Sequence, residues 1–144
     1  KEDGMKQSQK LLLTWLIEDT RLFKTIEGLI TPEDFTEELY HRVAEKLFEQ
    51  YKTEGTVNPA QIVSMEAGEE EQREIASLFN ATIHEVETQN EMEKALKETI
   101  IRIKQNSINY RSDHLDPNDM AGLMKVIEDK RALEKLEKLH ISIN

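Results

Sequence analysis

Two Glu-x-x-His pairs are the residues of this 144-residue chain whose types and spacing come closest to a catalytic site. They are Glu38 with His41, and Glu137 with His140. Residues three apart share one helix face, so each pair would offer a carboxylate and an imidazole to one metal ion, as in di-iron bundles where two further helices each add a Glu. However, the pattern of its helix places Glu38 on a polar face, and His140 lies near the chain end. We therefore expect surface residues and no metal site, with a metal-dependent oxidoreductase as the enzyme alternative.

The other residues with catalytic potential form no recognisable site. His84 and His114 are not part of any serine and carboxylate arrangement that suggests a catalytic triad. The chain has no glycine-rich phosphate loop and no His-Glu-x-x-His motif, and it contains no cysteine. The run of three glutamates at residues 69–71 is interpreted as helix-start charge rather than as a contact for a basic partner. We expect a non-catalytic chain without a cofactor.

Residues 31–55 carry the best-defined helix signals. Thr31 is a candidate N-cap, Pro32 fits the first helical position, and two acids follow in the positively polarised first turn. Phe35 is expected to end a single turn, after which Thr36 starts a longer helix. From Leu39 onward the apolar residues fill about half of a helical wheel. A left-handed C-cap at Gly55 then closes the helix.

The remaining elements are also helical, so the sequence predicts an all-α fold. Helices are expected at residues 5–17, 20–27, 59–65, 69–79, 90–111 and 117–140. Residues 1–88 are predicted to form a compact multi-helix bundle, in which Gly28 caps a helix and Ile75, Leu78 and Phe79 are buried. Residues 89–144 are predicted to form a long helix followed by a C-terminal helical hairpin that projects from the bundle.

The final predicted helix changes its apolar face halfway along. Asp116 is its expected cap, with Pro117 at the first helical position. A charged run at residues 128–131 separates two apolar sets on different sides: Met120, Leu123, Met124 and Ile127, then Leu133, Leu136, Leu139 and Ile143. Either the helix breaks at the charged run or its two halves face different partners.

Charge is distributed unevenly along the chain. The net charge is −10, and residues 1–88 hold 9 basic against 19 acidic side chains, whereas residues 89–144 hold 10 of each. An acidic surface repels phosphate backbones, so direct nucleic-acid binding is not expected. The longest mostly apolar run, residues 11–17, is too short to cross a bilayer, so we expect no membrane contact and a soluble, intracellular protein.

Apolar residues of the predicted hairpin have no obvious core to fill. Methionines among them suit adaptable contact surfaces. Closure of the hairpin upon itself is the alternative explanation. The candidate partner-binding residues are Leu115, Met120, Leu123, Met124, Ile127, Leu139, Ile141 and Ile143.

A set of motifs in the first part of the chain resembles a known family. They are Lys10-Leu11-Leu12-Leu13 to Glu18, Leu29-Ile30-Thr31-Pro32-Glu33-Asp34-Phe35, Tyr40-His41-Arg42-Val43 to Tyr51, Gly55, and Val57-Asn58. This succession resembles the carboxy-terminal, helicase-binding domain of bacterial DnaG-type primase. It is also similar to the related amino-terminal domain of the DnaB-type replicative helicase.

The resemblance to primase implies a protein-protein interaction domain of the bacterial cytoplasm that acts at the replication fork. Its bundle would modulate the hexameric helicase, and its hairpin would dock onto the helicase's amino-terminal domains, coupling primer synthesis to DNA unwinding. Primer synthesis and zinc binding would belong to preceding parts of a longer protein, and the chain starts at Lys1. We expect the fragment alone to be monomeric. A chain that is instead the helicase's own amino-terminal domain would self-associate.

Overall fold

A computed structural model describes residues 4–79 and 88–142; for Phe79 it describes the backbone only. The described residues form helices and no strand, which confirms the all-α prediction. His84, Ile143 and the side chain of Phe79, all singled out above, lie outside this description. The elements are α1 (Gly4–Glu18), α2 (Leu22–Thr25), the 3-10 turn η1 (Pro32–Asp34), α3 (Glu38–Glu54), α4 (Pro59–Ser64), α5 (Glu69–Phe79), α6 (Gln89–Asp113) and α7 (Met120–Lys138).

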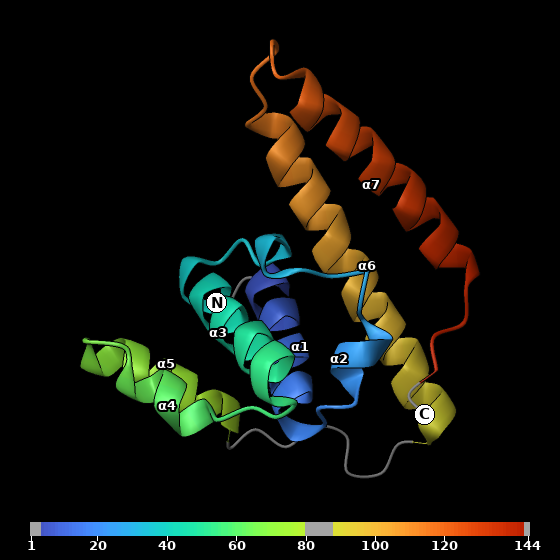
Figure 1. The fold of residues 1–144 in the computed structure, drawn as a ribbon. Coiled ribbons are helices and arrows are strands. Elements are labelled where there is room, and N and C mark those ends of the chain that lie inside the picture. The colour runs from blue at the N-terminus through green and yellow to red at the C-terminus, as the bar shows by residue number, and fades with distance from the viewer. Residues whose placement is uncertain (1–3, 80–87, 143–144) are drawn as a thin grey trace.

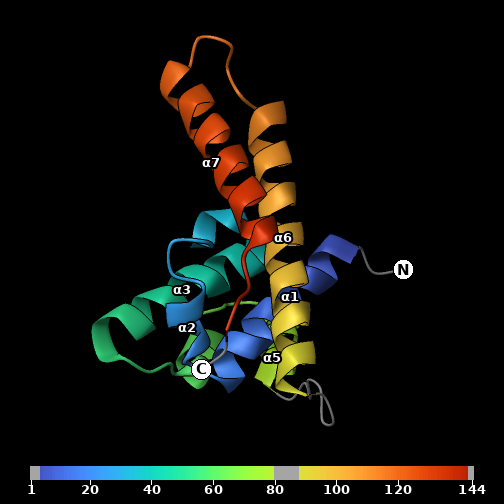
Figure 2. The same ribbon diagram turned by 90° about the vertical axis from the view of Figure 1, so that its right-hand side faces the viewer.

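The helices gather around α1 and α6. The helix α1 contacts α2, α3, α5 and α6, whereas α6 contacts α1, η1 and α7. The distal half of α6 extends beyond the bundle, and α7 returns beside it, as both ribbon views show (Figure 1 and Figure 2). The helix α6 thus packs against both the bundle and α7. Its distal half forms the helical hairpin with α7.

The core joins residues from both parts of the chain. Because apolar residues recur at helical spacing, each main helix turns one face inward. The main contributions come from Leu12, Leu13, Trp15 and Leu16 of α1, from Tyr40, Val43, Ala44 and Leu47 of α3, and from Leu96, Ile100, Ile103 and Ile108 of α6.

The segment before α3 forms the single turn predicted, but α3 starts later than Thr36. The backbone N–H of Thr31 donates to Asp34 Oδ2 at 2.9 Å, and η1 ends at Phe35. The N-cap of α3 is Glu37, whose N–H donates to Oε1 of Gln9 at 3.1 Å. A side chain of α1 therefore satisfies this helix start, which no local pattern reveals. The other end matches the prediction, since Gly55 has φ 73° and its N–H donates to the Tyr51 carbonyl at 2.8 Å.

Two further boundaries also differ from the predictions. The prediction of Asp116 as the cap of α7 is wrong: its carboxylate accepts the N–H of Asn118 at 2.9 Å, an Asx turn. Asp119 caps α7 instead, because its Oδ1 accepts the N–H of Gly122 at 2.8 Å. The short helix α2 covers only part of residues 20–27, and its C-cap is Ile26, so the prediction that Gly28 caps it is wrong. Gly28 lies two residues further on and has φ 80°.

The helix α7 runs without a break through the charged residues 128–131. This excludes a break at the charged run. The alternative that is left is that the two halves of α7 face different surroundings.

None of the described helices is both long enough and apolar enough to cross a membrane.

Candidate partner-binding site

The outer half of α7 presents apolar side chains to solvent. Met120, Leu123, Met124 and Ile127 are 64%, 39%, 55% and 38% exposed. Their spacing of three and four residues puts them on one helix face, here called the apolar stripe. The face that α7 buries carries Val126, Asp129, Leu133 and Leu136. Because the hairpin has its own buried face, closing the hairpin does not require the apolar stripe.

A buried carboxylate connects the bundle to α6. Asp34 is 2% exposed, and its Oδ1 accepts the hydroxyl of Ser107 at 2.7 Å. The ammonium of Lys104 lies 3.1 Å from Oδ2, and Nη2 of Arg111 lies 4.0 Å from Oδ1. The backbone N–H of Thr31 also donates to the Asp34 carboxylate, which holds the side chain within the turn η1. Asp34 thereby fixes η1 against the middle of α6.

Arg111 extends this contact to α7. Its Nη1 lies 2.7 Å from Oδ2 of Asp129, and Lys125 Nζ lies 3.1 Å from Oδ1 of the same carboxylate. Burial raises the pKa of Asp129, but the close Arg111 and Lys125 outweigh burial, and the net pKa is lowered. The contact between Arg111 and Asp129 is close but not aligned as a hydrogen bond, and Asp129 Oδ2 and the Nε and Nη2 of Arg111 have no hydrogen-bond partner. Ion pairs therefore link η1, α6 and α7 through Asp34, Arg111 and Asp129, and not a fully satisfied hydrogen-bond network.

The residues after α7 fold back onto the bundle. Ile141 is only 6% exposed, so it contributes to the core instead of offering the unburied surface expected from the sequence. His140 Nε2 lies 3.0 Å from Oε1 of the buried Glu93, and the hydroxyl of Thr25 donates to the Ser142 carbonyl at 3.4 Å. These contacts tie the tail to α6 and α2, at the opposite end of α6 from the hairpin turn (Figure 1).

The structure thus separates the candidate partner-binding residues. The four residues of the apolar stripe are exposed together, and Leu139 is 56% exposed beyond the end of α7. Leu115 is half-buried in the hairpin turn. The sequence reasoning missed Tyr110, which is 51% exposed and stacks on His114 with ring centroids 4.2 Å apart.

The Glu-x-x-His pairs do not converge on a common centre. The Glu38 side chain is 92% exposed and pairs with Arg42, whereas His41 Nδ1 lies 2.8 Å from the Pro32 carbonyl. His140 contacts Glu93 and not a member of the other pair. Within residues 4–79 and 88–142, no three His, Cys, Asp or Glu side chains are grouped so as to hold a metal ion. The geometry of the described residues gives the di-metal alternative no support.

Comparison of the chain with protein-family models, with curated proteins and with solved structures finds no match. The resemblance to the primase domain therefore remains a prediction from the sequence motifs.

Proposed function

We propose that this chain is a non-catalytic interaction domain that binds the replicative hexameric helicase of bacteria, coupling primer synthesis to DNA unwinding. The observation that carries the proposal is the apolar stripe on a hairpin that projects from the bundle (Figure 2). The family resemblance supplies the identity of the partner, and the stripe supplies a surface to contact it.

The composition of the stripe suits a protein partner. Two of its four residues are methionines, whose unbranched, polarisable side chains adapt to different contact surfaces. A contiguous apolar patch that the fold itself leaves unburied is typical of a protein interface. In this proposal the bundle modulates the helicase, and the charged link through Asp34, Arg111 and Asp129 holds the hairpin in position for docking.

The test is complex formation between this chain and a hexameric bacterial helicase on gel filtration. Replacing Leu123 and Met124 together by Gln removes the centre of the stripe without touching the buried face of α7, so the complex should be lost. Met65→Gln is the matched control, because Met65 is 53% exposed but lies on the bundle after α4. A complex that survives the double substitution, with unchanged elution, would refute docking through the stripe.

Self-association through the same surface would favour the alternative of a helicase amino-terminal domain. Light scattering of the chain alone distinguishes the two. The primase proposal expects a monomer. An oligomer that the Leu123→Gln/Met124→Gln substitutions dissociate would support the alternative.

A further inference from the structure

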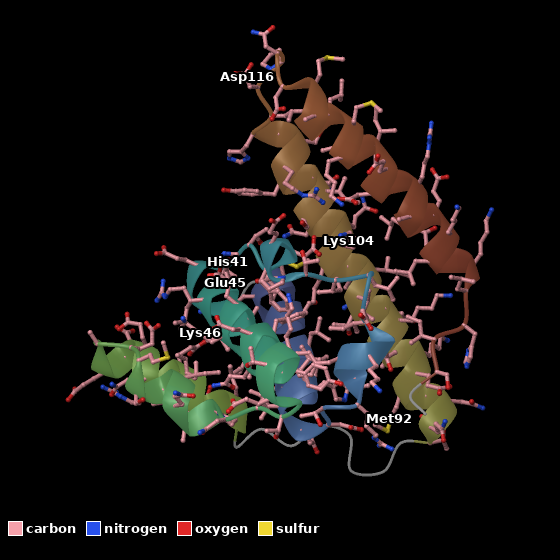
Figure 3. All side chains as sticks on the ribbon, in the orientation of Figure 1. His41, Glu45, Lys46, Met92, Lys104 and Asp116 are labelled. Atoms are coloured by element: carbon pink, nitrogen blue, oxygen red, sulfur yellow. The ribbon has the colours of Figure 1, made fainter. Side chains whose placement is uncertain are left out.

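A cleft of about 490 Å³ separates the bundle from the inner side of α7. Its bundle side is formed by the segment around η1 and by the acidic face of α3, and its hairpin side by Ala132, Leu133 and Leu136. Lys104, Arg111, Lys125, Asp34 and Asp129 also line it. Figure 3 shows His41 and Glu45 together on α3, with Lys104 on α6. The cleft thus has an apolar wall opposite a charged one, and we call it the acidic cleft.

The charges of the acidic cleft do not cancel. Five acidic side chains and three basic ones line it. All three basic groups contact Asp34 or Asp129. Glu33, Glu45 and Glu49 are left. Of the described basic groups, only His41 lies within 4.0 Å of any of these carboxylates, with its Nε2 at 3.5 Å from Glu45 Oε1. An ionised carboxylate without a counter-charge beside an apolar wall attracts a cationic group.

A second, more apolar hollow of about 740 Å³ adjoins the cleft. Its wall includes Phe23, Phe48 and Tyr51, which form one aromatic cluster. Two lysines, Lys24 and Lys52, and two glutamates, Glu27 and Glu49, also line it, so its own charges balance. The rings of Phe23 and Tyr51 stack with centroids 4.5 Å apart, and Phe48 meets Phe23 edge-on at 5.2 Å. The two hollows share the lining residues Gly28, Thr31, Pro32 and Glu49. We call this second hollow the aromatic hollow.

We propose that the acidic cleft and the aromatic hollow together bind one basic, amphipathic segment of a partner protein. A large apolar side chain of that segment occupies the aromatic hollow, and a Lys or Arg next to it pairs with Glu49 and Glu45. Both hollows have the size of sites that take a few side chains, and a single anchor in an aromatic pocket is a common source of binding energy. This site is separate from the apolar stripe, so it does not depend on the identity of the helicase as partner.

Charge decides between this occupant and others. A phosphate or another small anion would meet a cleft whose lining has two more acidic than basic side chains. A purely apolar segment would leave those carboxylates desolvated without a partner, which costs free energy. A segment that joins an apolar anchor to a basic group satisfies both walls.

The experiment measures fluorescence anisotropy of a labelled helical peptide built from Leu and Lys with one central Trp, titrated with the whole chain. Two comparison peptides replace every Lys by Glu, or the Trp by Ala. Both should bind more weakly than the original peptide that contains Lys and Trp. Raised salt should weaken binding of this original peptide. Glu45→Gln/Glu49→Gln should raise its Kd by about ten-fold, since two close charge pairs are lost.

The matched control is Glu54→Gln/Glu70→Gln, which removes the same charge from exposed positions outside both hollows. It should change the Kd by less than about two-fold. Equal effects of the two double substitutions would show attraction to net charge alone and would overturn the site. Equal binding of the Glu-containing peptide would overturn it too. A dimer of the chain that Glu45→Gln/Glu49→Gln dissociates would make a second copy the occupant and refute a partner segment. No helicase enters this experiment, so its failure leaves the proposed function standing.

Discussion

Replacing Asp34 by Asn should destabilise the fold far more than an ordinary loss of one charge. Asp34 is 2% exposed, and its carboxylate accepts from Thr31, Lys104 and Ser107. The amide of Asn can keep one oxygen toward Ser107. Its NH₂ group then faces the Thr31 N–H and the Lys104 ammonium, so donors oppose donors.

The size of the effect follows from the burial of the groups left behind. Removing one partner of a buried ion pair costs about 3–5 kcal/mol, and leaving a buried donor unsatisfied costs about 1–3 kcal/mol. The two costs partly describe the same loss, so they do not add in full. The side chain of Lys104 is 13% exposed, so water partly solvates it, and Arg111 keeps Asp129 as an ion-pair partner. We therefore expect the lower end, about 3 kcal/mol, from a total of about 5–15 kcal/mol for a typical domain.

Urea unfolding measures this loss with two probes. The single tryptophan, Trp15, is 3% exposed in α1 and reports on the bundle by fluorescence, while far-UV circular dichroism reports on all helices. Glu33→Gln is the matched control, because Glu33 is an exposed acid in the same turn, and its effect should stay within about 0.5 kcal/mol. Asp34→Asn should also cost less in a Lys104→Met background, with a coupling of about 1–2 kcal/mol. A destabilisation no larger than that of Glu33→Gln, or strict additivity with Lys104→Met, would refute the ion-pair reasoning.

Three further predictions concern α7, the tail and the end of α3. Because the folded-state pKa of Asp129 is lowered, its ionised form stabilises the fold above its unfolded pKa of about 3.9, and that contribution is lost as the pH falls through the lower folded value. Asp129→Asn should therefore reduce the free energy of unfolding at neutral pH, with a deficit that shrinks below about pH 4; a deficit independent of pH would contradict this. Ile141→Ala should cost about 2 kcal/mol in urea unfolding, whereas Leu139→Ala should stay within about 0.5 kcal/mol, and equal effects would show that the tail is not packed. Gly55→Ala should lower stability by about 1 kcal/mol because its φ of 73° is unfavourable for a residue with a Cβ; no change in the unfolding midpoint would mean that the helix end relaxes freely.

Local patterns identified most helices but not all of their ends. Periodicity and caps placed the long helices within a few residues, because amphipathic spacing and residues such as Gly55 act within one turn. The start of α3 depends on Gln9, a residue of another helix, so no local pattern predicts it. For α7 the sequence predicted Asp116 as the cap, whereas Asp119, three residues further on, caps it.

For the candidate site, the sequence predicted a set of apolar residues without a core, and the structure divided it. The stripe from Met120 to Ile127 is exposed because the other face of α7 packs on α6. Ile141 is buried because the tail returns to the bundle. The direction taken by a terminal tail depends on distant contacts, which a residue's own neighbours do not encode.

By itself, the sequence determined a helical chain, an acidic first part and a final helix with two differently directed apolar faces. Only the tertiary structure decided that Asp34, which the sequence presented as a helix-start acid, is the buried centre that joins the bundle to the hairpin. Its partners Lys104 and Ser107 lie 70 and 73 positions away along the chain. Burial of a charge depends on such long-range contacts, because only groups brought together by folding can replace the water that a carboxylate loses.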